Sequence, residues 1–254
     1  MKCLGLKVLL ILLMFGIDAR AGDRITIAAA SDLRYALNDI VSLFQQQYPS
    51  AGIDVIFGSS GKITTQIVNG APYDIFFSAD VEFPKRLHRD GLTATEPSVY
   101  AIGRIVLWSK RHNASVMTLH DLVDPSIRRI AIAQPMHAPY GQRAKEALMA
   151  VGIWNDIQSK LVFAENIASA AQMTESEAAD AGIIALSLAL FPDLARHGYH
   201  LIDDALHQPL TQGYVITKYG KDNSLAHEFA RFMTQEAAIT IMEHYGFVLP
   251  GRHP

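Results

Sequence analysis

Four short segments of the sequence place small or hydroxyl residues directly before a stretch with helical spacing. They are Ala29-Ala30-Ser31-Asp32, Gly58-Ser59-Ser60-Gly61, Ala138-Pro139-Tyr140-Gly141 and Glu165-Asn166-Ile167-Ala168. The first backbone N–H groups of a helix have no partner inside the helix, and the helix dipole adds positive potential at that end. Anions bind at such positions. The four segments therefore indicate places where a small anion could be held.

Helix capping is the alternative explanation for the same residues. Ser31, Ser60 and Asn166 are all good N-caps, and capping accounts for most serines and asparagines at helix starts. Arg34 and Ile63 stand where Ser31 and Ser60 would need Glu or Gln to complete a capping box. Both interpretations stay open from the residues alone.

Catalytic motifs do not fit these segments. Residues 58–62 are similar to a phosphate-binding loop, but Ile56 stands at its first glycine and Ile63 replaces the Ser or Thr that holds magnesium. Lys62 occupies the position where a nucleophile elbow needs glycine. We therefore predict no catalytic residue and no enzyme activity.

The histidines do not have the spacing of a metal site. His88, His112, His120 and His137 are scattered along the chain without pairing on one helix face, so solvated histidines are the simpler interpretation. His137 precedes the segment at 138–141 and is interpreted as a loop residue rather than a general base. The sequence predicts no cofactor.

The N-terminus has the pattern of an export signal. Lys2 and Lys7 precede and flank an apolar run over residues 8–17, and Ala19-Arg20-Ala21 offers small residues for cleavage after Ala21. The run is too short to span a bilayer, which takes roughly 20 residues. We expect a signal peptide at residues 1–21, a periplasmic mature protein and no membrane insertion after cleavage.

Composition narrows the partners of the mature chain. Loss of residues 1–21 removes three basic residues and one acidic residue and takes the net charge from −3 to −5. It also removes Cys3, the one cysteine of the sequence. A mildly acidic chain without cysteine predicts no nucleic-acid partner, no disulfide and no thiolate chemistry.

Strand-like runs alternate with amphipathic stretches, which predicts parallel sheets covered by helices. Two further runs, at residues 103–108 and 213–217, have the character of long strands and enclose a self-contained β/α set. An α/β fold follows, with an inserted second lobe and the two runs as crossovers. We expect lobe I at residues 22–102 and 215–254, and lobe II at residues 103–214.

In the four segments before the predicted helices, and in several others, the sequence resembles the periplasmic molybdate-binding protein family of ABC importers, the ModA-type family. The resemblance covers nearly the whole mature chain. The residues that carry it are Ala28-Ala29-Ala30-Ser31, Ser59-Ser60 followed by Gln66-Ile67 and Gly70-Ala71-Pro72, Asp74 to Asp80, Ala138 to Gly141 with Ala144 to Leu148, and Tyr245-Gly246-Phe247. The spacing from Tyr140 to Ile167 also matches the family's distance between its two ligand loops in the second lobe.

The resemblance implies the type II periplasmic binding protein fold, with two α/β lobes, two crossover strands and a ligand cleft between the lobes. It further implies that Ser31 and Ser60 offer hydroxyl and backbone donors, and that Tyr140 and Ile167 donate backbone N–H groups to molybdate or tungstate. Asp32 is expected to contribute through its backbone, because its carboxylate would repel a dianion. The implied partner is the membrane permease of an ABC importer, and we expect a monomer.

One position departs from the family pattern. Many members carry a tyrosine after a Gly-Ile-Val-like strand, whereas here Ala185 follows Gly182-Ile183-Ile184. The hydroxyl of Tyr140 is one candidate to replace that donor. Alternative functions are binding of another anion such as sulfate or phosphate, or an anion-sensing regulatory domain. Replacing Ser60 by Ala is expected to weaken anion binding and to leave the melting temperature nearly unchanged.

Overall fold

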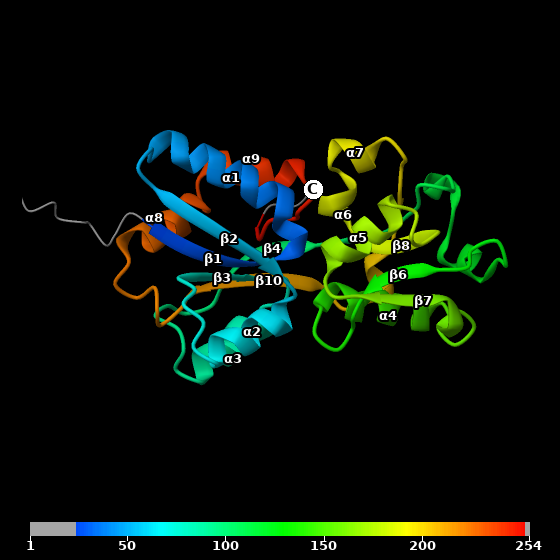
Figure 1. Cartoon of the computed structure of the whole chain (residues 1–254), viewed down its shortest axis with the longest axis horizontal. Helices are drawn as coiled ribbons and strands as arrows, with labels where there is room; N and C mark the ends of the chain where they lie inside the picture. The colour runs from blue at the N-terminus through cyan, green and yellow to red at the C-terminus, as the bar shows by residue number, and fades with distance from the viewer. Residues whose placement is uncertain (1–23, 252–254) are drawn as a thin grey trace, which may run out of the picture.

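Two five-stranded sheets, each flanked by helices, lie side by side in the computed structural model of the chain (Figure 1). The structure describes residues 24–251. The expected signal peptide at residues 1–21 and its cleavage near Ala21 lie outside the described residues. The two-lobed α/β fold predicted from the sequence is confirmed.

The first sheet has the strand order β2-β1-β3-β10-β4. Its strands are β1 (Arg24–Ala30), β2 (Gly52–Gly58), β3 (Ile75–Ser78), β4 (Ser98–Gly103) and β10 (Leu210–Ile216). Strand β1 pairs in parallel with β2 and β3, as predicted. Strand β10 is antiparallel to both β3 and β4, so the sheet is mixed rather than purely parallel.

Helices cover both faces of the first sheet (Figure 1). The helices α1 (Arg34–Gln47), α8 (Ser224–Phe232) and α9 (Glu236–His244) lie on one face, and α2 (Ser60–Val68) and α3 (Glu82–Arg89) lie on the other. The apolar face of α1 is fixed by Phe44, whose ring packs edge-on against Phe229 and Phe232 at 5.1 and 5.2 Å between centroids. The helical spacing read from the sequence therefore corresponds to a buried face.

The second sheet has the order β7-β6-β8-β5-β9. Its strands are β5 (Ile105–Trp108), β6 (Ile130–Ala133), β7 (Leu161–Ala164), β8 (Ala181–Ala185) and β9 (His200–Leu201), and its helices are α4 (Pro139–Ala150), α5 (Ile167–Glu175), α6 (Leu186–Ala189) and α7 (Pro192–Ala195). Short 3-10 helices are η1 (Ser31–Leu33), η2 (Ala114–Val116), η3 (Leu119–Val123), η4 (Gln158–Lys160) and η5 (Asp204–Leu206). We call the part built on the first sheet the first lobe and the part built on this sheet the second lobe.

The chain crosses between the lobes next to β4 and β10. These strands pair with each other, with Leu210 opposite Gly103. The apolar run at residues 103–108 is not one long strand, because β4 ends at Gly103 and β5 begins at Ile105. Strand β5 pairs with β8 in the second sheet, which turns the chain away from β10 at Arg104. The lobe boundaries at residues 102/103 and 214/215 stay a prediction.

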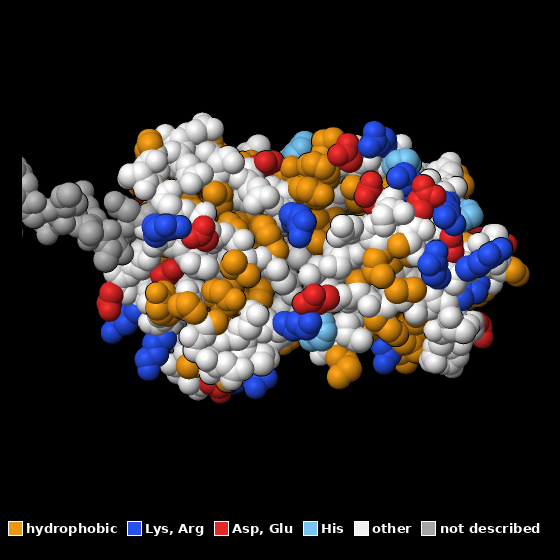
Figure 2. Space-filling model, in the orientation of Figure 1, with side chains coloured by type: hydrophobic (Ala, Val, Ile, Leu, Met, Phe, Trp, Pro, Cys, Tyr) orange, Lys and Arg blue, Asp and Glu red, His pale blue; other side chains and the backbone are white. Residues whose placement is uncertain are grey.

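The described surface carries charges of both signs. On the face in Figure 2, acidic and basic side chains are interspersed. Because neither sign of charge dominates this face, attraction for an anion must arise locally, from the groups that surround its site.

Within residues 24–251, no helix is both long enough and apolar enough to cross a bilayer.

Candidate functional site

A small cavity of about 10 Å³ lies between the two lobes. All five residues predicted to bind the anion line it, namely Ser31, Asp32, Ser60, Tyr140 and Ile167. The other lining residues are Ala30, Gly58, Ser59, Ala79, Ala138 and Pro139. The four segments singled out in the sequence thus meet at one point, although Ser31 and Ile167 are far apart in the chain. That they bind an anion stays a prediction.

The cavity suits a small ligand that is recognised by neutral donors. Its volume is below the roughly 300–1,000 Å³ of pockets for drug-sized molecules. The lining contains neither lysine nor arginine. Nearby, Lys62 is paired with Glu165 at 2.9 Å, and both side chains are exposed. Any attraction for an anion therefore comes from dipoles rather than from a cation in the wall.

Ser60 points its hydroxyl into this region from the first turn of α2. Ser59, not Ser60, is the N-cap of that helix. The Ser60 Oγ accepts a hydrogen bond from the backbone N–H of Ala79 at 3.0 Å, which leaves its own proton available for donation. The capping explanation is therefore wrong for Ser60.

Ser31 joins the two lobes through its hydroxyl. It is the first residue of η1, whose N-cap is Ala30, so it is not a cap either. Its Oγ accepts the N–H of Ala168 at 3.2 Å and donates to Oδ1 of Asn166 at 3.1 Å. A bound anion would compete with Asn166 for this proton.

Asn166 is a true N-cap, as the alternative interpretation predicted. Its Oδ1 accepts the backbone N–H of Ser169 at 2.9 Å at the start of α5. Ile167 is the first residue of the same helix, so its N–H has no acceptor within the helix. Capping and a free N–H at the cavity occur side by side here.

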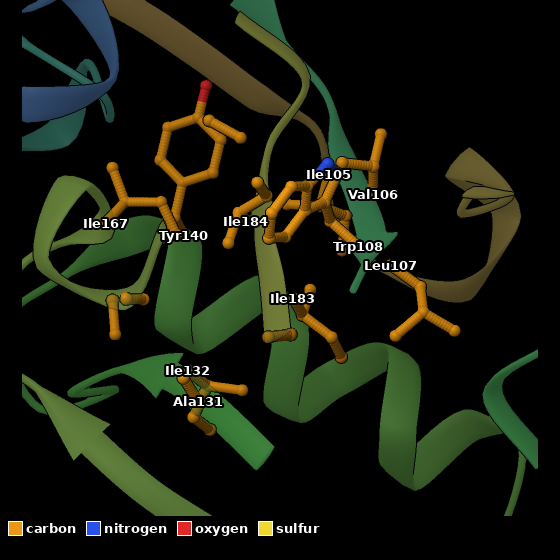
Figure 3. Close-up of a cluster of buried hydrophobic side chains, with 14 of the residues drawn as sticks. Ile105, Val106, Leu107, Trp108, Ala131, Ile132, Tyr140, Ile167, Ile183 and Ile184 are labelled. Atoms are coloured by element: carbon orange, nitrogen blue, oxygen red, sulfur yellow. The ribbon is translucent and has the colours of Figure 1, made fainter. Parts of the chain in front are cut away.

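Tyr140 is the second residue of α4, where its N–H also has no acceptor within the helix. Pro139 precedes it and has no N–H, which leaves Tyr140 as the first donor of that helix. In Figure 3 its ring lies beside Ile167, with the hydroxyl at the end away from Ile132. Tyr140 and Ile167 thus bring two helix N-termini to the same wall of the cavity.

Glycine is required beside Tyr140 because α4 starts close to a strand. A Cβ at Gly141 would lie 1.9 Å from the carbonyl oxygen of Ala133, the last residue of β6. Only glycine permits this approach. The Ala138-Pro139-Tyr140-Gly141 segment is therefore shaped to seat the helix N-terminus at the end of the strand.

Asp32 lies in the wall with its carboxylate fully buried. Burial raises its pKa to about 6, although hydrogen bonds from Gln212 and Tyr140 favour the charged form. Gln212 Nε2 and the Tyr140 hydroxyl donate to its Oδ2 at 2.7 and 3.0 Å. Oδ2 is thus engaged with the protein, and the expectation that the carboxylate is not a ligand for a dianion stays a prediction.

The hydroxyl of Tyr140 is held by Asp32 and Gln212 and so already has partners. Burial raises its pKa well above the ordinary value for tyrosine. Ala185 is the last residue of β8 and offers no hydroxyl. The proposed replacement of the family's tyrosine donor by the Tyr140 hydroxyl is therefore not supported by these contacts.

His137 sits at the rim, where it contacts the start of α2. Its Nδ1 lies 2.8 Å from Ser59 Oγ, and its carbonyl accepts the N–H of Gly61 at 2.9 Å. Burial lowers its pKa, and the charge of Lys62 lowers it further. His137 is a turn residue that joins the lobes, which agrees with its interpretation as a loop residue. In the part of the chain that the structure describes, no group of three or more His, Cys, Asp or Glu could hold a metal ion.

Sequence reasoning missed Gln212 and Tyr100, which complete the surroundings of Asp32. Gln212 is fully buried on β10, and its Oε1 accepts the hydroxyl of Tyr100 at 2.5 Å. A lone glutamine directly before an apolar strand run was the one available signal. Its partners lie on other elements, so no local pattern connects Gln212 with them.

Two α/β lobes with a small donor-lined cavity between them define a solute-binding protein. A family model described as bacterial extracellular solute-binding protein matches residues 25–248. The chain belongs to this family, which is a class of binding proteins rather than of enzymes.

Several known proteins are similar over most of their length. The molybdate-binding protein ModA of Azotobacter vinelandii is 32% identical over 237 residues, which cover 91% of this chain and 92% of that protein. The ModA of Rhodobacter capsulatus is 29% identical over 96% of this chain and 95% of its own. A solved structure of the periplasmic molybdate-binding protein of A. vinelandii has a TM-score of 0.83 at 31% identity, covering 89% of this chain and 99% of that one.

Proposed function

We propose that this chain is the periplasmic component of an ABC importer that captures molybdate or tungstate between its lobes and delivers it to the membrane permease. One observation carries the proposal: donors from two lobes meet at a cavity whose lining has no lysine or arginine. The relatives named molybdate-binding proteins support the choice of ion.

Ser31 and Ser60 bind the ion from the first lobe, and the N–H groups of Tyr140 and Ile167 bind it from the second. Asp32 contributes its backbone. Hydrogen bonds to a charged group each contribute on the order of 1.5–3 kcal/mol. Five or six of them reach the roughly −8 to −12 kcal/mol of micromolar to nanomolar binding, before closure costs reduce the sum.

The remaining features follow from this role. The lobes comprise residues 22–102 with 215–254, and 103–214, and the ligand favours their closed arrangement, which the permease recognises. Residues 1–21 direct export and are cleaved near Ala21. The mature protein is a monomer without cofactor, catalytic activity or nucleic-acid partner.

The test uses residues 22–254 purified without added anion. Isothermal titration calorimetry with molybdate, tungstate, sulfate and phosphate should give one site and the tightest binding for molybdate or tungstate. Native mass spectrometry of protein isolated from cells identifies the cargo, because molybdenum, tungsten and sulfur differ widely in mass. Preference for sulfate or phosphate, or no anion binding, would refute the proposal.

A further inference from the structure

Four polar side chains from four elements meet in a cluster where the lobes adjoin. They are Asp32 of η1, Tyr100 of β4, Tyr140 of α4 and Gln212 of β10. Tyr140 and Gln212 donate to Asp32 Oδ2 at 3.0 and 2.7 Å, and Gln212 also donates to the Tyr140 hydroxyl at 3.1 Å. Tyr100 donates to Gln212 at 2.5 Å. Of the four, only Tyr140 belongs to the part built on the second sheet, because Gln212 lies on β10 of the first sheet.

We infer that this cluster is a lock that holds the two lobes closed around the cavity, with Tyr140, Asp32 and Gln212 as positioning residues. The inference deepens the proposed function and rests on it for the identity of the ligand. The hydroxyl of Tyr140 is the part of the lock that crosses between lobes. Its separation from Asp32 is therefore set by how far the lobes close.

Gly103 shows that the lock is fitted to the crossover strands. A Cβ at this position would lie 2.3 Å from the Tyr140 hydroxyl oxygen and 2.5 Å from Gln212 Nε2. Gly103 ends β4, next to the residue at which the chain enters the second lobe. Glycine is needed at position 103 because a larger residue would collide with the side chains of the cluster.

The contacts between the lobes differ in burial: the hydroxyls of Ser31 and Ser187 also make buried hydrogen bonds across the lobes, whereas an ion pair at the rim is exposed. Lys62 and Glu165 form an ion pair at 2.9 Å, with side chains 49% and 60% exposed, and such pairs contribute little. The Tyr140 and Asp32 side chains are buried, and a hydrogen bond to a charged acceptor is stronger than one between neutral groups. Asp32 is held a second time, because its carbonyl accepts the hydroxyl of Ser187 from α6 at 2.8 Å.

Tyr140 then has two separate tasks. Its backbone N–H lies at the cavity, and its side chain belongs to the lock. Replacing Tyr140 by Phe removes the hydroxyl and leaves the N–H in place. The apparent affinity should fall because a smaller fraction of the protein is closed before binding. The loss should appear mainly as faster dissociation.

The chain offers a matched control for this variant. The hydroxyl of Tyr245 donates to Oδ2 of Asp39 at 2.8 Å, and both residues lie in the first lobe. Tyr140→Phe and Tyr245→Phe each remove one tyrosine-to-aspartate hydrogen bond, but only the first bond crosses between lobes. For molybdate, we expect at least about a ten-fold loss of affinity in Tyr140→Phe, as for loss of a hydrogen bond to a charged group. Tyr245→Phe should stay close to wild type.

Gly103→Ala provides a second route to the same test. Its methyl group would displace the Tyr140 hydroxyl and the Gln212 amide, and its nearest atoms are side-chain atoms rather than the Tyr140 N–H that is proposed to bind the ligand. Its expected effect has the same direction as that of Tyr140→Phe. If Tyr140→Phe fails to fold, Gly103→Ala and the Tyr245→Phe control decide the question.

A distance measurement separates the lock from the ligand. Spin labels attached to cysteines introduced by Gln66→Cys in α2 and Met149→Cys in α4 report the separation of the lobes. The mature chain has no cysteine of its own that would also be labelled. Without anion, Tyr140→Phe and Gly103→Ala should show a longer or broader interlobe distance than wild type and Tyr245→Phe. Unchanged distances and unchanged molybdate dissociation would overturn the lock even if the wild type binds molybdate. If the wild type binds no anion, the proposed function fails, and the anion-free distances still decide the lock.

Discussion

The Oγ of Ser60 lies 3.0 Å from the backbone nitrogen of Ala79 and accepts its hydrogen bond. This contact fixes the Ser60 hydroxyl so that its proton is free to point at the cavity. Ser60→Ala should weaken molybdate binding about ten- to a hundred-fold, as expected for loss of one hydrogen bond to a charged ligand. Calorimetry of the purified variant measures the change.

The same contact corrects the expectation that Ser60→Ala leaves the melting temperature unchanged. The variant leaves the buried N–H of Ala79 without its hydrogen-bond acceptor, which costs roughly 1–3 kcal/mol of folding stability. Ser109→Ala is the matched control, because Ser109 Oγ accepts the N–H groups of Arg111 and His112 away from the cavity. Ser109→Ala should lower the melting temperature and keep the affinity. Equal affinity in both variants would remove Ser60 from the site.

Gly61 should control how closely the lobes approach at the rim. A Cβ here would lie 2.8 Å from the carbonyl oxygen of His137, which belongs to the other lobe. Gly61→Ala should therefore hold the lobes apart and weaken anion binding. The first lobe should not lose stability, because Ala is a better helix former than Gly. Titration calorimetry and thermal unfolding, measured on the same sample, test both statements.

The neighbouring Lys62 provides the comparison for Gly61. Lys62→Ala removes the exposed pair with Glu165 but introduces no steric clash. Because exposed ion pairs contribute about 0–1 kcal/mol, the affinity should change less than about five-fold. A loss in Lys62→Ala as large as that in Gly61→Ala would show that charge, not steric closure, dominates this edge of the cleft.

The sequence predicted those parts of the fold and site that depend on local pattern. The junctions before Ser31, Ser60, Tyr140 and Ile167 were visible because each combines a strand-like run, a small or hydroxyl residue and helical spacing. Their meeting at one cavity followed from the family resemblance. Local pattern and homology together therefore located the cavity.

Contacts that depend on the placement of the lobes were out of reach. The bond between Tyr140 and Asp32 joins residues from two lobes, and Gln212 reaches both from a returning strand. The break at Arg104 was missed because residues 103–108 are continuously apolar except at that position. Pairing with β10 on one side and β8 on the other decides where that strand divides.

Asp32 should make stability depend on pH in a defined direction. Its pKa in the folded protein, about 6, lies above the ordinary value of 3.8 because the carboxylate is buried. Its favourable contribution is therefore complete below about pH 4 and is lost as the pH rises through 6. A shift of this size corresponds to roughly 3 kcal/mol.

Asp32→Asn removes that titration and keeps an oxygen for Tyr140 and Gln212. Relative to wild type, the variant should gain stability between pH 4 and pH 8, as measured by urea unfolding across that range. Asp54→Asn is the control, because Asp54 is an exposed partner of Arg24 and should give a small difference. If the difference in unfolding free energy between Asp32→Asn and wild type stays constant with pH, the raised pKa of Asp32 is contradicted.

Anion binding should also be visible as stabilisation, and the choice of anion should matter. A ligand that binds only the folded form at one hundred times its Kd adds about 2.7 kcal/mol. For a chain of this size that raises the melting temperature by roughly 5–10 °C. Molybdate and tungstate should produce this rise.

Sulfate at the same concentration should raise the melting temperature far less. It has the charge and shape of molybdate but is smaller, so lobes that close around the larger ion should contact sulfate less well through Ser60 of one lobe and the Tyr140 N–H of the other. A dilution series in each anion separates specific binding from a general salt effect. Stabilisation by specific binding increases with the logarithm of the ligand concentration once that concentration exceeds Kd. Equal shifts with sulfate and molybdate at every concentration would show that the cavity does not select by size, and the discrimination would then have to come from the permease.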